Sequence, residues 1–178
     1  VDNASKDGSL EVLRQEYPEA QIIALDSNTG FCHAVNVGIK AAKTPYVILL
    51  NNDTKVFDGF VKALYEKIIS NEKIFSVSAM MIQAKNHELI DDAGDFYCAL
   101  GWAFARGTGK PADKYTKVTE VFSACAGAAI YRKSLFDEIV CVVLTGMGAD
   151  GTKGILSLEK SKPVYVISQN AQTCVVYG

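Results

Sequence analysis

Apolar runs of strand length alternate with helix-like segments through the first half of the chain, and this alternation limits the folds open to it. Residues 46–53 read YVILLNND, a continuous apolar run closed by polar residues, which is typical of a strand buried on both faces. Strands are also predicted at 21–26 and 74–83, and helices at 9–17, within 27–45 and at 57–73. The alternation predicts an α/β fold, a three-layer sandwich with a mostly parallel sheet covered by helices.

The length and composition indicate one soluble domain. The chain has 178 residues, of which 49% are hydrophobic and 21% are charged, and its formal net charge is -2. Nothing in this balance indicates a nucleic acid or a membrane surface as partner, and no apolar run approaches the roughly 20 residues of a spanning helix. Because Val1 looks like the end of a strand, we interpret the sequence as a fragment.

The cysteines and histidines do not predict a metal centre of their own. The two histidines share no ligand spacing, and surface or helix-face positions account for both of them. The five cysteines are scattered without a C-x-x-C pair, which favours small buried side chains in a reducing, cytoplasmic compartment. They are Cys32, Cys98, Cys125, Cys141 and Cys174.

Polar residues follow each predicted strand of the first half. Asp2 and Asn3, residues 26–30 and residues 51–53 all stand at strand ends, and each group includes a carboxylate. In open α/β sheets ligands bind beyond the carboxyl ends of the strands. At any single turn, turn formation is the better explanation of Asp, Asn and Gly, but three such turns together weaken it. The pattern therefore predicts a polar cleft for a hydrated cation or a nucleotide.

Four phrases, in this order and spacing, resemble family 2 glycosyltransferases, particularly the rhamnosyltransferase-like group. They are VDNASKDGS, NTGFCHAVNVGI, VILLNNDT and FSACAGAAIYRKSLFDEI, and together they cover residues 1 to about 139. The resemblance implies a GT-A type, Rossmann-like fold that takes a sugar from a nucleotide-diphosphate donor. Residues 91–115 resemble the acceptor-side region of that family.

The resemblance also implies roles for individual residues. Asp2 would face the nucleotide base, and Asn28 and Gly30 match the turn that lies close to the nucleotide. Asp53 would hold a divalent metal, manganese or magnesium, on the diphosphate. The common D-x-D motif reads Asn51-Asn52-Asp53 here, so a single carboxylate remains and weak metal binding is expected.

Two departures from the family imply impaired catalysis. Family members begin with a strand, a helix and a second strand before the position of Val1, and they continue after SLFDEI to a Glu-Asp pair that supplies the catalytic base. Neither feature occurs in this sequence. Loss of general-base assistance typically costs a factor of roughly 100 to 10,000 in rate.

Residues 140–178 resemble a different family, the chemotaxis-receptor methylesterases. The phrases LTGMGADG and CVVYG carry this resemblance, which implies that Asp150 is the carboxylate of a catalytic triad. A triad carboxylate works through a histidine and a serine. The serine and histidine motifs of that family do not occur in the chain, so Asp150 is expected to be an inactive remnant.

The same tail predicts a strand, helix and strand at 141–146, 151–160 and 164–169. We expect this βαβ unit to dock into the sheet of residues 1–139 and complete one domain, in place of the opening unit. We therefore interpret the chain as a chimera joined near Ile139. Three functions stay open: an impaired glycosyltransferase, a recombined or engineered scaffold without catalysis, and, last, a methylesterase-like hydrolase.

Overall fold

The computed structural model describes residues 1–98, 100, 102–138, 141–143 and 166–168. The chain divides into two compact units. One holds Thr44–Asp137, and the other holds Val1–Lys43 with the described part of Glu138–Gly178. Each unit is described by itself below.

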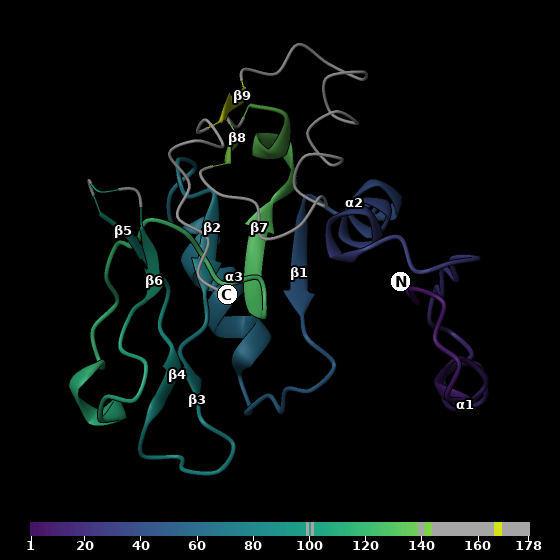
Figure 1. Ribbon diagram of the computed structural model, residues 1–178, viewed down its shortest axis with the longest axis horizontal. Coiled ribbons are helices and arrows are strands. Elements are labelled where there is room, and N and C mark those ends of the chain that lie inside the picture. The colour runs from purple at the N-terminus through teal and green to yellow at the C-terminus, as the bar shows by residue number, and fades with distance from the viewer. Residues whose placement is uncertain (99, 101, 139–140, 144–165, 169–178) are drawn as a thin grey trace. The chain divides into compact units, whose positions relative to one another are not determined.

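The larger unit is organised by a three-stranded sheet with the order β1-β7-β2 (Figure 1). The strands are β1 (Tyr46–Leu50), β7 (Ala128–Arg132) and β2 (Ser76–Ser78). Both β1 and β2 are antiparallel to β7, with Ile48 and Val77 facing Ile130 from the two sides. The central strand therefore comes from the far end of the unit's sequence.

The predicted mostly parallel, Rossmann-like sheet is wrong. Strands β1 and β2 run in the same direction, as the alternation predicts, but β7 lies between them and is antiparallel to both. The alternation of helices and strands predicts a parallel sheet only when consecutive strands pair with each other. It does not predict that a strand from later in the sequence lies between them. The remaining sheets of this unit are antiparallel pairs.

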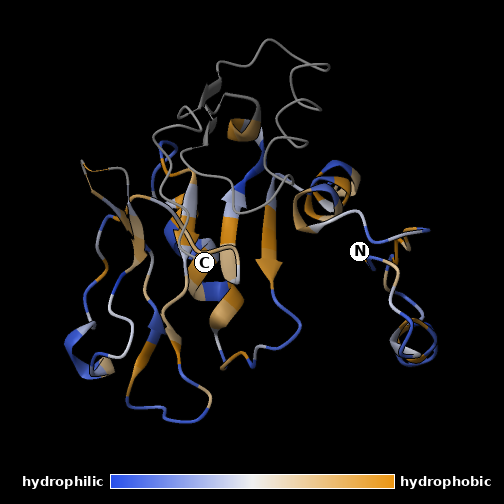
Figure 2. Ribbon diagram, in the orientation of Figure 1, coloured by the Kyte–Doolittle hydropathy of each residue, from blue (hydrophilic) through white to orange (hydrophobic). Residues whose placement is uncertain are grey.

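The core of this unit lies between the sheet and helix α3 (Phe60–Ile69). Leu64 and Ile68 on the helix pack with Ile130 of β7, and Ile68 is fully buried. This spacing of four residues places both helical side chains on one face. In Figure 2 strand β1 is coloured mainly as hydrophobic, consistent with its place in the sheet.

Two short hairpin-like pairs and two 3-10 helices complete the unit. Strand β3 (Met81–Ile82) pairs with β4 (Ile90–Asp92), and β5 (Asp95–Tyr97) pairs with β6 (Ala103–Ala105). The 3-10 helices are η1 (Ala112–Lys114) and η2 (Lys133–Glu138). The predicted single strand at 74–83 is divided into β2 and β3.

The first 43 residues carry two helices, α1 (Ser9–Glu16) and α2 (Phe31–Ala41), as the sequence predicts. Helix α1 begins where Asp7 accepts hydrogen bonds from the backbone and hydroxyl of Ser9. The strand predicted at 21–26 is reduced to one parallel bridge, between Asp2 and Ala24. Polar and charged residues dominate the exposed α1, which has no buried residue.

Strands β8 (Cys141–Val143) and β9 (Val166–Ser168) pair with each other in parallel as a two-stranded sheet. The connection predicted to be a helix, and the rest of the tail, lie outside the described residues. The docking of this tail into the domain stays a prediction. Among the described residues, no helix is both long and apolar enough to cross a membrane.

Candidate functional site

The polar residues after the first two predicted strands lie together in the smaller unit. The Asn3 amide donates a 3.0 Å hydrogen bond to Asn28 Oδ1, and Asn3 Oδ1 accepts one of 2.9 Å from the Thr29 backbone. Asn28 Oδ1 also accepts a 3.0 Å hydrogen bond from the Gly30 backbone. The two turns, 25 residues apart in sequence, therefore form one hydrogen-bonded group, which we call the Asn3–Asn28 group.

Backbone pairing brings these two turns to the same place. The Asp2 backbone N–H donates to Ile23 at 2.8 Å, and the Leu25 N–H donates to the Asp2 carbonyl at 2.9 Å. Gly30 then precedes helix α2 with a φ of 83° and a ψ of 163°, a positive-φ conformation that costs other residues steric energy. A glycine at this position thus has a structural reason independent of any ligand.

The carboxylate of Asp2 is held by the turn that follows it. Hydrogen bonds from the Ser5 side chain and backbone, the latter at 3.1 Å, lower the pKa of Asp2 below its ordinary value. The carboxylate therefore stays charged to a lower pH than an ordinary aspartate does. Its remaining lone pairs are available to hydrogen-bond donors such as the N–H of a nucleotide base.

In the larger unit, three segments meet at one end of the sheet. Strand β1 ends at Leu50, and the Asn51 N–H donates a 2.9 Å hydrogen bond to the Gly127 carbonyl just before β7. On the other side of β7, the Ala79 N–H donates to the Ala128 carbonyl at 2.9 Å. Because β1 and β2 are parallel to each other, both of their carboxyl ends lie here, and we call this place the sheet edge.

Asp53 lies in the turn that leaves the sheet edge. The Thr54 hydroxyl and backbone donate to the Asn51 carbonyl at 2.6 and 3.3 Å and close this turn. Asp53 is exposed. Among the described residues there is no group of three His, Cys, Asp or Glu side chains that could hold a metal ion.

A single exposed carboxylate fits one kind of metal binding. Magnesium and manganese are commonly held by one or two carboxylates together with substrate phosphates and water. Asp53 therefore fits a metal that arrives with a diphosphate, and it does not fit a metal bound by the described residues alone.

A buried carboxylate that sequence reasoning missed lies beside the sheet edge. Asp92 is opposite Met81 in the β3–β4 pair, and the Met81 Cε lies 3.4 Å from the point that a Cβ on Gly127 would occupy. Asp92 is 7% exposed, and its Oδ1 accepts a 2.7 Å hydrogen bond from the Gly94 backbone. Burial raises the pKa of Asp92 above its ordinary value, the Gly94 hydrogen bond opposes this, and two neighbouring aspartates add to it.

The loop before β7 is fixed to its surroundings. The Ser123 hydroxyl donates to Asp95 at 2.7 Å, and the Tyr131 hydroxyl donates to the Ala124 carbonyl at 3.2 Å. Burial raises the pKa of Tyr131 to about 12, so its phenol remains a donor. Burial likewise raises the pKa of the Cys125 thiol, which makes it a poor nucleophile at neutral pH.

The predicted site residues thus fall in different parts of the structure. Asp2, Asn28 and Gly30 belong to the smaller unit. The turn at Asp2 and the turn at Asn28 are neighbours there. Asp53 belongs to the larger unit. Asp150, the predicted triad remnant, lies outside the described residues. The aspartates of DDAGD (residues 91–95) are evident in the sequence. The burial of Asp92 follows from tertiary packing, and no local sequence pattern predicts it.

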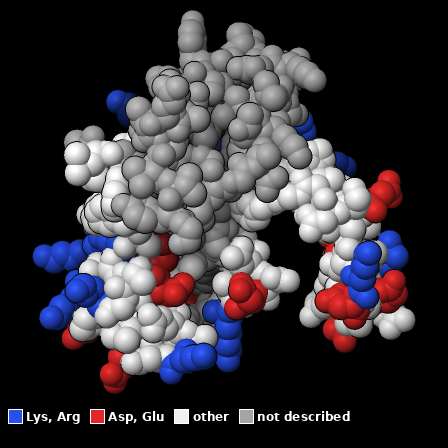
Figure 3. All heavy atoms as spheres, in the orientation of Figure 1, with Lys and Arg blue, Asp and Glu red and all other residues white. Residues whose placement is uncertain are grey.

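Charged residues of both signs occur together on the face drawn in Figure 3. Among the described residues on this face, lysine and arginine are interspersed with aspartate and glutamate. An ion pair joins Lys62 to Glu66 at 3.9 Å, one turn apart on α3. The predicted absence of a nucleic-acid partner stays a prediction.

Comparison with known protein families divides the chain into two overlapping parts. Residues 1–140 match the family Glycosyl transferase family 2. Residues 129–178 match the family CheB methylesterase. The two resemblances that the sequence predicts are confirmed. The matches overlap over residues 129–140, so the junction near Ile139 stays a prediction.

The chain is also similar to curated proteins of the second kind. It is 28% identical over 167 residues to the protein-glutamate methylesterase/protein-glutamine glutaminase 2 of Vibrio vulnificus, covering 89% of this chain and 46% of that protein. The corresponding Bdellovibrio bacteriovorus protein is 29% identical, with 89% and 44% covered. A shorter match to the Symbiobacterium thermophilum protein is 50% identical over 42 residues, 24% of this chain and 11% of that protein. The chain spans less than half the length of the first two.

Proposed function

The chain belongs to glycosyl transferase family 2, and from this membership we propose that it binds a nucleotide-diphosphate sugar through residues 1–140. The observation that carries the proposal is the family match over those residues. The Asn3–Asn28 group contributes polar side chains and a charged carboxylate, Asp2, for the nucleotide. Asp53 would hold a magnesium or manganese ion that arrives with the diphosphate.

Metal binding at Asp53 serves the leaving group. A divalent cation held there would supply positive charge to the diphosphate leaving group. One carboxylate with two neighbouring amides, Asn51 and Asn52, offers less charge than a pair of aspartates. We therefore expect the metal to bind weakly unless the nucleotide is present.

Transfer itself is expected to be slow. The acceptor oxygen must attack the sugar carbon and lose its proton while the nucleoside diphosphate departs, and a positioned carboxylate normally takes that proton. The Glu-Asp pair expected after residue 139 is not in the sequence, where the methylesterase-like segment stands instead. Without that base, a rate lower by roughly 100 to 10,000 is the general expectation.

A methylesterase function is the second candidate because the relatives of that kind align with 89% of the chain. Ester hydrolysis by a triad needs a histidine next to a serine. Among the described residues, both His33 and His87 are exposed and neither makes a hydrogen bond to a serine hydroxyl. This favours a glycosyltransferase function over an esterase function.

The experiment that tests the proposal is a calorimetric titration of the full chain with UDP-glucose and with dTDP-glucose, each with and without manganese. Saturable binding of either nucleotide sugar, with a dissociation constant of about 1 mM or below, supports a donor site. Absence of heat for both, in a folded sample, favours a scaffold without a donor site. Hydrolysis of a carboxylate methyl ester that is lost in Asp150→Asn would instead favour the esterase.

A further inference from the structure

A tight turn in the larger unit carries a cationic residue at each end. Strand β6 ends at Ala105, and the Lys110 backbone N–H donates a 2.8 Å hydrogen bond to the Gly107 carbonyl. Gly107 and Gly109 have φ values of 82° and 72°, the left-handed conformation that glycine adopts readily. The turn places Arg106 and Lys110 at its two ends, where both line one cavity.

Arg106 is held in place by its surroundings. Its guanidinium carbon lies 4.7 Å from the centre of the Tyr115 ring, and its Nη1 donates a 3.3 Å hydrogen bond to the Ala93 carbonyl. The Tyr115 ring lies so close to Gly107 that a Cβ there would be 2.8 Å from two ring carbons. Arg106 therefore keeps further N–H donors in a fixed position for another acceptor.

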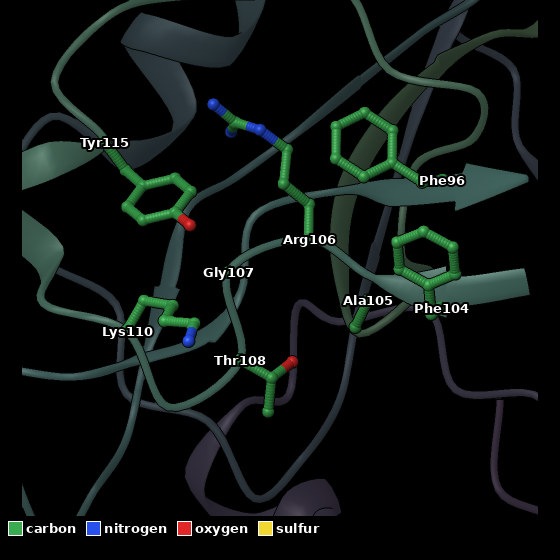
Figure 4. A pocket seen from close by; sticks show the side chains of 8 residues that line it. All are labelled: Phe96, Phe104, Ala105, Arg106, Gly107, Thr108, Lys110 and Tyr115. Atoms are coloured by element: carbon green, nitrogen blue, oxygen red, sulfur yellow. The ribbon is translucent and has the colours of Figure 1, made fainter.

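The cavity has a cationic side and an aromatic side (Figure 4). It is open to solvent and has a volume of about 430 Å³. Arg106, Lys110, Thr108 and Tyr115 carry polar groups at one side. The rings of Phe96 and Phe104, 5.8 Å apart and 39% and 54% exposed, form the other side.

The positive charge of this cavity is not neutralised by the described residues. No aspartate or glutamate is among the eight residues that line it. Within the described part of the chain, neither Arg106 nor Lys110 makes an ion pair with a carboxylate. Cationic side chains that line a cavity without a counter-charge attract an anion, and an arginine matches the geometry of a phosphate or carboxylate.

We propose that this cavity binds an anionic sugar, with its phosphate or carboxylate on Arg106 and Lys110 and its ring against Phe96 and Phe104. Aromatic faces suit the apolar C–H side of a sugar ring, and the volume accommodates one such unit. The proposed glycosyltransferase function adds only that this sugar is the acceptor. Binding of the anionic sugar does not depend on the donor.

The test is a set of titrations of the full chain, without nucleotide or metal, with glucose 1-phosphate, glucuronate and uncharged glucose. At low salt we expect glucose 1-phosphate or glucuronate to bind at least about tenfold more tightly than glucose, and to weaken as sodium chloride is raised. Lys110→Gln should weaken that binding by about tenfold, because one of two cations is removed. Lys85→Gln, outside the cavity lining, should not change it.

Phe104→Ala tests the contact with the sugar ring separately from the contact with the anionic group. It should weaken glucose 1-phosphate binding while leaving inorganic phosphate binding unchanged. Both Phe104 and Lys110 are exposed, so these substitutions leave the core intact. Binding of neither anionic sugar, or binding that is the same in Lys110→Gln and Arg106→Gln as in the wild type, would overturn the proposal. Asp53→Ala removes the proposed metal ligand of the donor site and should leave the binding of the anionic sugar unchanged. Failure of the donor site and failure of the anion site are therefore seen in different experiments.

Discussion

Arg132 on β7 donates a 2.6 Å hydrogen bond from its Nη2 to the carbonyl oxygen of Ile68, in the last turn of α3. The same guanidinium donates to the Asn71 and Ile74 carbonyls at 3.1 and 3.0 Å and to the Tyr46 hydroxyl at 3.0 Å. It thereby joins the central strand to the end of the helix that covers it. A cation is also favourable at a helix C-terminus.

Replacing Arg132 is expected to destabilise the larger unit. Arg132→Ala leaves several carbonyl groups without their donor and should lower the free energy of unfolding by roughly 2–4 kcal/mol. Arg132→Lys keeps the charge but loses the fork of donors, so it should recover only part of this. Urea denaturation of the full chain measures both. A change below about 0.5 kcal/mol in Arg132→Ala would show that these bonds do not stabilise the unit.

Gly107 and Gly109 offer a matched pair of substitutions. Both have positive φ, but a Cβ on Gly107 would meet the Tyr115 ring at 2.8 Å, whereas a Cβ on Gly109 has no neighbour within 4 Å. Gly109→Ala should therefore cost about 1–2 kcal/mol from the backbone alone. Gly107→Ala should cost about 1–3 kcal/mol more, since the ring must also move. Equal melting temperatures for the two variants would contradict this account of the turn.

Asp92 is expected to make stability depend on pH. Because its folded-state pKa is raised by burial, the folded protein binds the proton more tightly than the unfolded chain does. The stabilisation that Asp92 contributes is fully present below its pKa in the unfolded chain. It is lost as the pH rises through its pKa in the folded protein. The contribution of Asp92 to the free energy of unfolding should therefore decrease as the pH is raised from acid to neutral.

Asp92→Asn removes this titration and keeps an oxygen for the Gly94 N–H. The stability of the variant relative to the wild type should therefore rise between acid and neutral pH, as measured by urea denaturation at several pH values. Asp113→Asn, an exposed aspartate in η1, serves as the control. A difference between wild type and Asp92→Asn that does not change with pH would rule out the raised pKa.

Asn3 is expected to hold the turn at residues 28–30. Asn3→Ala removes the hydrogen bonds to Asn28 and to the Thr29 backbone, so hydrogen exchange at the Thr29 amide should become faster. If this group binds the nucleotide, UDP affinity should also fall, by about tenfold. Gln15→Ala on the exposed α1 should change neither. Unchanged exchange at Thr29 would show that Asn3 does not order the turn.

The sequence predicted the elements better than their arrangement. Helices α1, α2 and α3 begin and end near glycine, proline and amphipathic signals that lie within each segment. The strand at 46–50 was equally visible as a continuous apolar run. The insertion of β7 between β1 and β2 depends on pairing across about 80 residues with β1 and about 50 residues with β2, and no local pattern reports such pairing.

The candidate site was predictable to a similar extent. Turn residues at strand ends pointed to Asp2 and Asn28, and their turns do lie together. The burial of Asp92 and the cationic cavity at Arg106 arise from tertiary contacts with Met81 and Tyr115, which composition and spacing do not reveal. The functional roles of Asp2, Asn28, Gly30 and Asp53 stay predictions.

The most direct test of the donor site is the effect of manganese on UDP affinity in the wild type and in Asp53→Ala, measured by calorimetry on the full chain. We predict that manganese tightens UDP binding by about tenfold or more in the wild type and in the control Asp58→Ala, an exposed aspartate of the same loop. Asp53→Ala should bind UDP equally with and without the metal. The same manganese effect in Asp53→Ala as in the wild type would contradict a metal-assisted donor site at this residue.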